Sequence, residues 1–252
     1  MTDFSPLFRF AVLFVRPGML VMAAPTFGGA WAPTQVRIGL TLLLTFMLIP
    51  IVHVPAVASE VGLALIVLRE LAIGLAIGFG VKALITGAEL AGHLSGYSIG
   101  FSYGSVVDPQ SGVRNNMIAA LYGNVALLTF FATNAHHTLI RAMVSSYAVM
   151  PIGAGHLDGS LVGSVTEMLG LVFVLGVRLA MPLVVVLLLV ELAMGLIARA
   201  APMLNLLIAG MPVRIVVGLL VVSGVVGVAP DVISGFTQSA IEIGFRAARA
   251  FR

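Results

Sequence analysis

The stretch MLGLVFVLGVRLAMPLVVVLLLVELAMGLIA, residues 168–198, decides the fold class of this chain. Its 31 residues include only two charges, and at 1.5 Å per residue a helix of this length measures about 46 Å. A plain membrane span needs only about 20 apolar residues to cross roughly 30 Å of hydrocarbon. The stretch is therefore too long for a simple crossing, and Pro182 near its middle predicts a kink or a break.

The composition of the whole chain is that of a membrane protein. Of its 252 residues, 60% are hydrophobic and 9% are charged, whereas soluble domains carry roughly 25% charged residues. Cysteine is absent, which excludes disulfides, thiolate metal sites and cysteine nucleophiles. The formal net charge of +3 is too small to indicate nucleic-acid binding and fits charges at membrane surfaces. We therefore expect an integral membrane protein without a sizeable soluble domain.

Hydrophobic runs separated by glycine- and proline-containing turns predict an all-α protein. The runs form about six helical units, at 5–25, 36–52, 61–101, 117–150, 162–198 and 203–229, followed by a short amphipathic tail. We expect the third, fourth and fifth units to be kinked helices or hairpins. Short and broken units indicate either a transporter with discontinuous helices or a protein whose helices pack against other subunits.

Small residues recur at every fourth position before the middle of the chain. They are Ala88, Gly92, Gly96, Gly100 and Gly104. On a helix these residues form a continuous ridge without large side chains, and such ridges let backbones approach closely in membranes. Two interpretations stay open: packing within the subunit, or contact with neighbouring subunits by a helix that is soft enough to bend.

A polar segment follows this ridge and interrupts the hydrophobic pattern. It comprises Tyr103, Gly104, Ser105, Val106, Val107, Asp108, Pro109, Gln110, Ser111 and Gly112, and the polar run continues to Asn116. Proline disfavours helix at the residue before it. Irregular backbone at membrane depth persists only where it is buried in protein or lines a watery cavity. The segment is therefore either a surface loop or a loop inside a pore.

Within the apolar runs 61–81 and 168–198, four charged residues stand out, namely Arg69, Glu70, Arg178 and Glu191. Ionisable groups inside a membrane are costly, are usually paired and are candidate functional sites by default. Arg178 and Glu191 would lie about 20 Å apart along a helix, so they cannot pair unless the chain folds back at Pro182. Each charge needs a partner elsewhere in the chain or in another subunit, and a structural salt bridge is the simpler interpretation for any one of them.

The sequence indicates no catalytic, cofactor or metal site. His136 and His137 are adjacent, so on a helix they point to different sides and do not form a chelating pair. No Gly-x-x-x-x-Gly-Lys-Ser/Thr loop is present to bind a nucleotide. An intramembrane hydrolase would need a nucleophile and a base, and we expect no catalytic serine. The prediction is a protein that is not an enzyme and holds no cofactor.

The C-terminal tail AIEIGFRAARAFR, residues 240–252, places arginines at spacings of three. Read as a helix, it carries a drifting basic stripe of Arg246, Arg249 and Arg252 beside Phe245 and Phe251. Positively charged residues favour the cytoplasmic side of a membrane, so we expect this end to be cytoplasmic.

The segment RAAPMLNLLIAGMPVRIVVGLLVV, residues 199–222, resembles the C-terminal signature of the R/T subunits of type III export gates, the FliR family. The matching positions are Arg199, Pro202, Asn205, Gly210, Pro212 and Gly218. Met203 stands where the family often has glutamine, and Leu207 stands where an aromatic residue is usual. A role for that amide is therefore not carried over to this chain.

Other blocks of the chain resemble the same family in the same order. The N-terminal pattern is represented by Arg16, Pro25, Arg37 and Pro50, the next by Arg69-Glu70 with Gly74 and Gly78, and the central one by GFSYGSVVDPQSG, Asn134, His136, Ser145-Ser146 and Pro151. The resemblance covers roughly residues 5 to 245.

The resemblance implies a non-enzymatic subunit of the type III export gate in the bacterial inner membrane, at a flagellar basal body or an injectisome base. It implies assembly with the P and Q subunits (FliP and FliQ types), proximity to the FlhB-type switch protein, and passage of unfolded substrates. It also implies one membrane domain over 1–252, with a P-like part at about 1–150 and a Q-like part at about 160–252. In this family the loop after the glycine-rich helix is a plug, which corresponds here to 103–116.

The alternative function is a polytopic transporter of a small solute or an ion, built from broken helices around the four intramembrane charges. Copurification separates the two possibilities. A gate subunit is extracted in a stable complex with two other small hydrophobic proteins, whereas a transporter is extracted alone or as a homo-oligomer.

Overall fold

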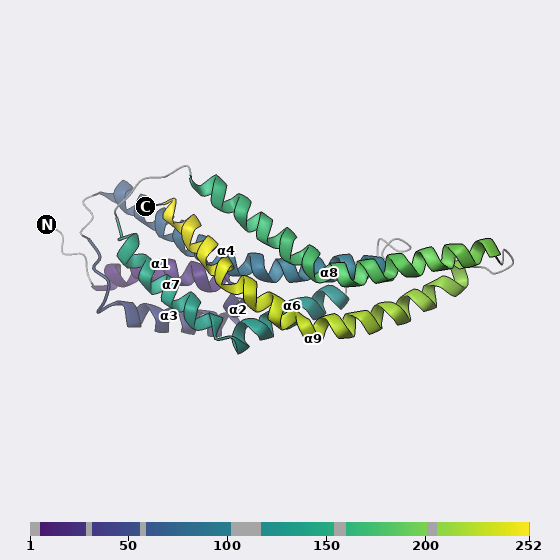
Figure 1. Ribbon diagram of the computed structural model, residues 1–252. Coiled ribbons are helices and arrows are strands. Elements are labelled where there is room, and N and C mark those ends of the chain that lie inside the picture. Colours follow the sequence, from purple (N-terminus) through teal and green to yellow (C-terminus); the bar gives the residue numbers. More distant parts are fainter. Residues whose placement is uncertain are drawn as a thin grey trace. The chain divides into compact units, whose positions relative to one another are not determined.

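The computed structural model describes residues 6–28, 32–55, 59–101, 117–153, 160–200 and 206–251. These residues form helices joined by short turns, and no strand occurs among them (Figure 1). The helices are α1 (Pro6–Ala23), α2 (Pro25–Gly28), α3 (Thr34–Leu48), α4 (Glu60–Ile99), α6 (Met117–Ala132), α7 (Ala135–Val149), α8 (Ser160–Ala200) and α9 (Leu206–Arg249). The predicted all-α fold class is confirmed.

Among the described residues, three helices are long and apolar enough to cross a membrane, namely α4, α8 and α9, and the pair α6 and α7 passes the same test together. Helix α3 is apolar but has only 15 residues, since Pro50 follows closely after its end. The chain is therefore an all-α membrane protein with three or four candidate spans.

The third and fifth predicted units are single helices and not hairpins. Helix α4 runs through 40 residues with no proline inside it. Helix α8 runs through 41 residues and contains Pro182. A proline removes one backbone donor, but a long apolar helix can tolerate that loss when its surroundings satisfy the freed carbonyl. Of the two forms expected for these units, a kinked helix or a hairpin, the hairpin is therefore wrong.

The fourth predicted unit is broken, as expected. Helices α6 and α7 meet at a bend of 70°. At the break, Asn134 adopts a left-handed conformation with φ 55° and ψ 24°. Asparagine is among the few non-glycine residues that tolerate this region, because its short polar side chain bonds locally.

The last predicted unit continues beyond its expected end at 229. Helix α9 extends for 44 residues through Pro212 and Pro230, so the amphipathic tail forms its final turns and not a separate element. Helix α1 also contains a proline, Pro17. Proline was thus a poor marker of helix ends along these apolar segments.

The chain divides into two compact units made from interleaved segments. Unit 1 comprises residues 1–83, 130–170 and 237–252, and unit 2 comprises residues 84–129 and 171–236. In unit 1, helices α1, α3 and α7 lie side by side (Figure 1). Buried leucine, isoleucine, valine and methionine side chains fill the core of unit 1, among them Leu20, Ile73, Ile77, Leu139 and Met143.

Glycines allow the helices of unit 1 to approach closely. A Cβ placed on Gly74 of α4 would overlap the backbone carbonyl of Arg16, and one on Gly78 would lie 2.7 Å from the Cβ of Ala23. Interhelical distances this short require residues without side chains, as membrane helix packing generally does. These two glycines therefore fix α1 against the first half of α4.

In unit 2, the end of α8 and the beginning of α9 run side by side (Figure 1). The second half of α4 packs against the start of α6 and against α8, where Gly87 meets Leu175. Helix α9 is the least covered: only 17% of its most apolar 18-residue window is buried, against 33% for α4. Much of the apolar surface of α9 therefore faces outward.

Candidate functional site

A fully buried ion pair, between Arg16 of α1 and Glu70 of α4, lies in unit 1. Both side chains have 0% exposure. Arg16 donates from Nε to Oε2 of Glu70 at 2.7 Å and from Nη2 to Oε1 at 2.8 Å, so the pair is bidentate. From α7 and the residue after it, Ser146 Oγ accepts from Nη1 at 2.7 Å and the Met150 carbonyl accepts from Nη2 at 3.0 Å. The Tyr147 ring lies 4.0 Å below the guanidinium carbon.

Both charged groups of this cluster have hydrogen-bonding partners inside it. The cluster comprises Arg16, Glu70, Ser146, Tyr147 and Met150. The guanidinium has an acceptor in each direction, and Ser146 in turn donates to the Met143 carbonyl at 2.5 Å. A bidentate pair at these distances is among the strongest hydrogen-bonded contacts in proteins. Since both charges are paired and buried, the arrangement holds α1, α4 and α7 together and does not expose a reactive group.

Sequence reasoning identified one half of this cluster. Glu70 was expected to pair with a residue elsewhere, and its partner is Arg16. Arg16 entered the sequence argument only as part of a family pattern. The sequence did contain a signal for this pairing, because Arg16 also interrupts an apolar run and Glu70 needed a cationic partner.

Arg69, next to Glu70 in the sequence, points to a different part of unit 1. Its Nε donates to the backbone carbonyl of Phe251, beyond the end of α9. The neighbouring charges Arg69 and Glu70 therefore tie α4 to two separate segments, because adjacent residues of a helix face different directions.

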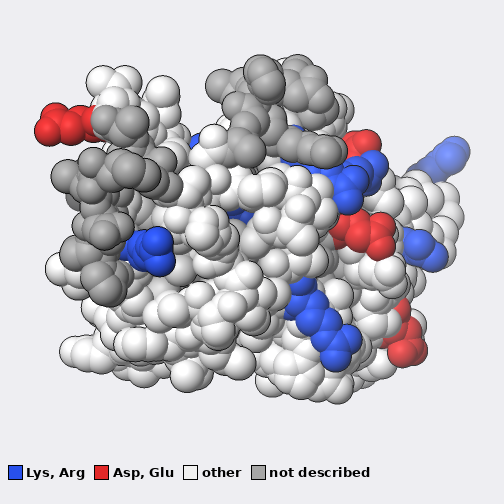
Figure 2. All heavy atoms as spheres, turned by 90° about the vertical axis from the view of Figure 1, so that its left-hand side faces the viewer, with Lys and Arg blue, Asp and Glu red and all other residues white. Residues whose placement is uncertain are grey.

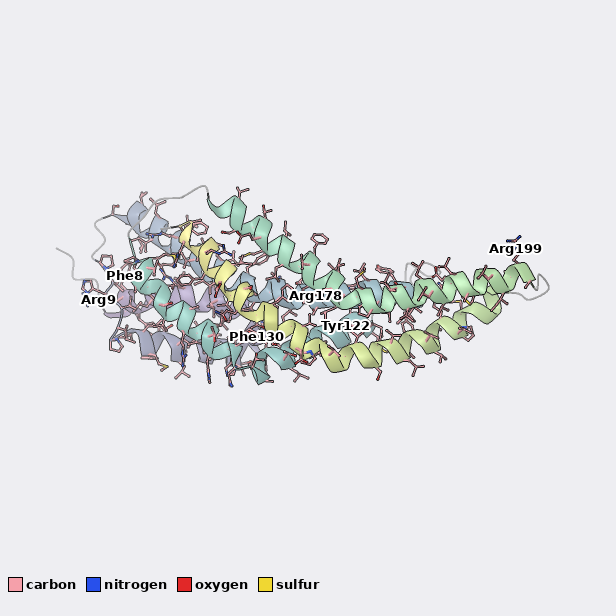
Figure 3. The ribbon with its side chains drawn as sticks, in the orientation of Figure 1. Phe8, Arg9, Tyr122, Phe130, Arg178 and Arg199 are labelled. Atoms are coloured by element: carbon pink, nitrogen blue, oxygen red, sulfur yellow. The ribbon has the colours of Figure 1, made fainter. Side chains whose placement is uncertain are left out.

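The two charges predicted on α8 have separate surroundings, as their spacing required. Glu191 accepts from Arg214 Nη2 of α9 at 2.9 Å, which is an ion pair within unit 2. Arg178 is exposed and its guanidinium lies 5.9 Å from the Phe236 ring centre. Figure 3 labels Arg178 along α8. The sequence did not identify Arg214, since its partner lies across a helical hairpin.

The small-residue ridge on α4 is covered within the chain over its described part. Ala88, Gly92, Gly96 and Gly100 are all buried. A Cβ on Gly92 would overlap the backbone of Ala119 at the start of α6. Packing within the subunit therefore accounts for the ridge at this point, and Gly104 lies outside the described residues.

The predicted plug loop, 103–116, lies outside the described residues, and so do Pro202 and Asn205 of the family signature. The other signature positions are placed. Arg199 lies exposed at the C-terminal end of α8, pointing away from the ribbon (Figure 3). Gly210 is buried on α9, where a Cβ would lie 3.3 Å from the sulfur of Met194, and Pro212 follows one half-turn later. A glycine and a proline of the family signature thus lie near the start of α9.

A serine motif needs a correction. Gly-x-Ser-x-Gly, the pattern of hydrolase nucleophiles, occurs twice, at 96–100 and 100–104, against the expectation that no serine stands in a catalytic context. Ser98 lies within α4 and donates to the Leu94 carbonyl at 2.9 Å. A nucleophile elbow requires a strand-to-helix turn, which a helix interior does not supply. The described copy of the motif is therefore helical packing, and Ser102 of the second copy lies outside the described residues.

Metal-binding and ion-pairing groups are sparse elsewhere. Within the described ranges, no cluster of three or more His, Asp or Glu side chains could hold a metal ion. The rings of His136 and His137 lie at the start of α7 with their centres 4.3 Å apart and their planes tilted by 52°. On the face shown in Figure 2, Lys, Arg, Asp and Glu occur singly or in small groups over a mostly uncharged surface.

Comparison with known proteins gives consistent relatives along almost the whole chain. The family model of bacterial export proteins, family 1, matches residues 7–240. The flagellar biosynthetic protein FliR of Escherichia coli (strain K12) is 31% identical over 201 residues, which is 79% of this chain and 77% of that protein.

Two further relatives come from different systems. FliR of Bacillus subtilis (strain 168) is 27% identical over 212 residues, covering 82% of each chain. The secretion system apparatus protein SsaT of Salmonella typhimurium is 24% identical over 220 residues, covering 85% of each chain. By the extent of the family match and by these similarities, the chain belongs to the FliR family of bacterial export proteins.

Proposed function

We propose that this chain is a structural subunit of a type III protein export gate in the bacterial inner membrane. In that role it helps to form the channel through which unfolded flagellar or virulence substrates pass. The family supports an export function, since its relatives bear the names of flagellar biosynthesis and secretion apparatus proteins. The chain's own contribution is architectural: its buried charges are paired, and they hold helices in place.

The observation that carries the proposal is the uncovered surface of α9. Large apolar side chains stand exposed along it, including Val216 at 59%, Leu220 at 69% and Val228 at 59%. Interleaved with them, Gly224 and Gly227 have no described atom within 4 Å of an added Cβ apart from their chain neighbours and the adjacent backbone of their own helix. Lipid can cover leucine and valine, but glycines in an apolar face favour the close approach of another helix. Neighbouring subunits are the natural cover for this helix.

The proposed neighbours are the P- and Q-type subunits, with the FlhB-type switch protein close to the C-terminal end. We extend to this chain the two-part comparison of the family, P-like at about 1–150 and Q-like at about 160–252. The compact units follow different boundaries, since both are made from interleaved segments. The comparison therefore concerns likeness to separate subunits and not independently folding domains.

Copurification tests the proposal directly. The tagged chain, coexpressed with its P- and Q-type neighbours and extracted in mild detergent, is expected to elute as one complex with both. Elution of the chain alone, or as a homo-oligomer that moves a small solute or an ion in vesicles, would favour the transporter alternative. The pairing of Glu70 with Arg16 and of Glu191 with Arg214 weighs against that alternative, because paired side chains offer no open site.

The plug is a separate proposal for 103–116. A seal that unfolded chains displace has to yield at low free-energy cost, and glycine and short polar side chains suit this requirement. Deletion of Ser105 to Gly112 is expected to raise ion leakage across the inner membrane of cells that contain the assembled gate. Unchanged leakage together with unchanged export would contradict a plug while leaving the subunit assignment intact.

A further inference from the structure

A groove of about 440 Å³ lies between α7 and the last turns of α9, entirely within unit 1. Arginines line it from both helices, with Arg141 on α7 and Arg246 and Arg249 on α9. Its apolar lining includes the half-buried ring of Phe245 and the buried side chain of Ile241. The groove therefore combines cationic donors and apolar contact area in one place.

Arginines outnumber acids in this groove, since its lining has Arg141, Arg246 and Arg249 against one carboxylate, Glu242. Arg246 is occupied, since its Nη2 bonds Glu167 Oε2 at 2.7 Å. Glu242 accepts from Gln238 Nε2 at 2.9 Å. Among the described residues, Arg141 and Arg249 form no ion pair, and the Arg249 guanidinium lies 5.1 Å from the Phe245 ring centre. Two guanidinium groups on neighbouring helices are thus available for an anion.

The chemistry of Arg141 and Arg249 indicates phosphate as the anion that they would bind. Guanidinium groups match phosphate oxygens with paired N–H donors, and each such charge-assisted bond is stronger than a neutral one. Pockets that hold small ligands measure roughly 300 to 1,000 Å³, so this groove fits a head group but not a complete lipid. Acyl chains would have to continue outside it, along apolar protein surface or in the bilayer.

The position of the groove on a membrane helix selects a lipid as the source of that phosphate. The arginines lie in the last turns of α9, which is an apolar helix of membrane-spanning character. Basic side chains at the ends of such helices lie where lipid head groups occur, and basic pockets between membrane helices bind anionic lipids. The half-buried ring of Phe245 offers the apolar contact that an acyl chain needs and a free phosphate does not.

We propose that this groove binds an anionic phospholipid, with the head-group phosphate between Arg141 and Arg249 and the upper acyl chain against Phe245. The site joins α7 to the end of α9, so an occupied groove would hold these two segments of unit 1 together. The inference rests on the groove itself and not on the export role, and it is tested on the purified full-length chain.

The test measures phospholipid binding by native mass spectrometry of the full-length protein in mild detergent. Phosphatidylglycerol is expected to bind at least about tenfold more tightly than zwitterionic phosphatidylethanolamine, a difference of about 1.4 kcal/mol. The double variant Arg141→Gln/Arg249→Gln is expected to lose that preference. The matched double variant Arg178→Gln/Arg199→Gln removes the same charge from exposed positions on α8 and is expected to keep it.

Further arms separate the remaining explanations. Arg141→Lys/Arg249→Lys keeps both charges and is expected to restore most of the preference, which a folding defect in the glutamine variant would not allow. Glycerol 3-phosphate has the head group without acyl chains; if it bound as tightly as the lipid, the site would be one for small anions. Equal loss in the α8 variant, or no preference in the native chain, would overturn the proposal. Displacement of the lipid by an acidic segment of a partner protein, at lower concentration, would make the groove a protein-docking site.

Discussion

Arg16 shows how a single residue organises a membrane protein without taking part in chemistry. Its side chain is fully buried, and it has partners on α4, on α7 and immediately after α7. Burying a charge without a partner is costly, so Arg16 and Glu70 each depend on the other. The cluster therefore acts as a positional constraint, since a shift of either helix would leave a charge unpaired in an apolar surrounding.

Removing one member of this pair is expected to destabilise the protein strongly. Arg16→Met leaves the Glu70 carboxylate buried without its cation, and Glu70→Leu leaves the guanidinium without its acid. Loss of one partner of a buried pair costs about 3–5 kcal/mol. The expected result is a large fall in the melting temperature in mild detergent. Arg9→Met is the matched control, because Arg9 is exposed on the same helix and should change the melting temperature little.

The double variant Arg16→Met/Glu70→Leu completes a thermodynamic cycle. Because it removes both charges, it is expected to be more stable than the sum of the two single changes predicts, with a coupling of about 1–3 kcal/mol. Additive effects would mean that the bidentate contact is not the source of the stability. The remaining loss should reflect Ser146 and Met150, whose oxygens lose a donor.

The sequence predicted which charges needed partners but not which partners they found. Glu70 and Glu191 were identified because ionisable groups in apolar runs are rare. Their cations, Arg16 and Arg214, lie 54 and 23 positions away in the chain, and only the packing of helices brings them near. A local pattern contains no information on such a separation, so each pairing required the fold.

At the scale of the element, the contact of α4 with α6 depends on a missing side chain. Gly92 faces the backbone of Ile118 and Ala119 directly. Backbone atoms cannot rotate away from a clash as the end of a long side chain can. The regular spacing of small residues, which the sequence shows plainly, is thus explained by a helix contact inside the chain.

Gly92→Ala is expected to destabilise the protein although alanine is the better helix former. The added methyl group forces α4 and α6 apart, and overpacking of this kind costs about 1–3 kcal/mol. Gly170→Ala on α8 is the matched control, because nothing lies within 4 Å of its added Cβ. Its helix propensity gain is about 1 kcal/mol. Melting temperatures should therefore move in opposite directions, and a shared direction would contradict the packing argument.

The break between α6 and α7 gives a second test at the element scale. Asn134 occupies the left-handed region, which costs most L-residues roughly 1–2 kcal/mol. Asn134→Gly is expected to preserve stability, whereas Asn134→Val should lower the free energy of unfolding by about that amount. The comparison is read as chemical denaturation in detergent. If valine were tolerated as well as glycine, the left-handed backbone would not be what sets the 70° bend.

The positions of the helices were predicted well, but the effect of the prolines on them was not. The difference arises because the surroundings of these helices are lipid and protein, not water. Hydrophobic runs gave the positions of α3, α4, α6 and α8 closely, since an apolar segment in a membrane protein has few alternatives to helix. Pro182 was expected to kink or break its helix and does not break α8, and Pro212 and Pro230 likewise lie inside a helix that continues past them. The rules for proline come chiefly from soluble proteins. There, water can hydrogen-bond the carbonyl that proline leaves unpaired, so ending a helix costs little free energy.

At the scale of the whole molecule, the chain is incomplete as a packing unit. Its buried ion pair joins α1 to α4 and its tightest glycine contacts include several on α4, whereas the part of α9 around Gly224 and Gly227 presents apolar side chains and glycines outward. Lipid can cover the exposed apolar side chains of α9, but it fills the spaces beside the exposed glycines poorly. The distribution of contacts therefore points toward neighbouring helices on α9, which the sequence alone offered only as one of two possibilities.

The last prediction concerns the open surface of α9 at Gly224 and Gly227. Gly227→Leu places a large side chain where only adjacent parts of its own helix lie within 4 Å, and leucine is the better helix former, so the melting temperature of the isolated subunit should not fall. In the assembled gate the same side chain would occupy the space of a neighbouring helix. We therefore expect copurification with the P- and Q-type subunits to fall at least about tenfold, a loss of about 1.4 kcal/mol in association.

Gly227→Ala provides the graded control for this experiment, since a methyl group fills far less of this space and should weaken copurification only slightly. Gly224→Leu, one turn away on the same open surface, should act like Gly227→Leu if a single neighbouring helix covers both positions. Full copurification of both leucine variants would show that lipid, and not protein, covers this part of α9. A fall in the melting temperature of the isolated subunit would instead place the defect within the chain, so the two measurements together separate a docking surface from an internal contact.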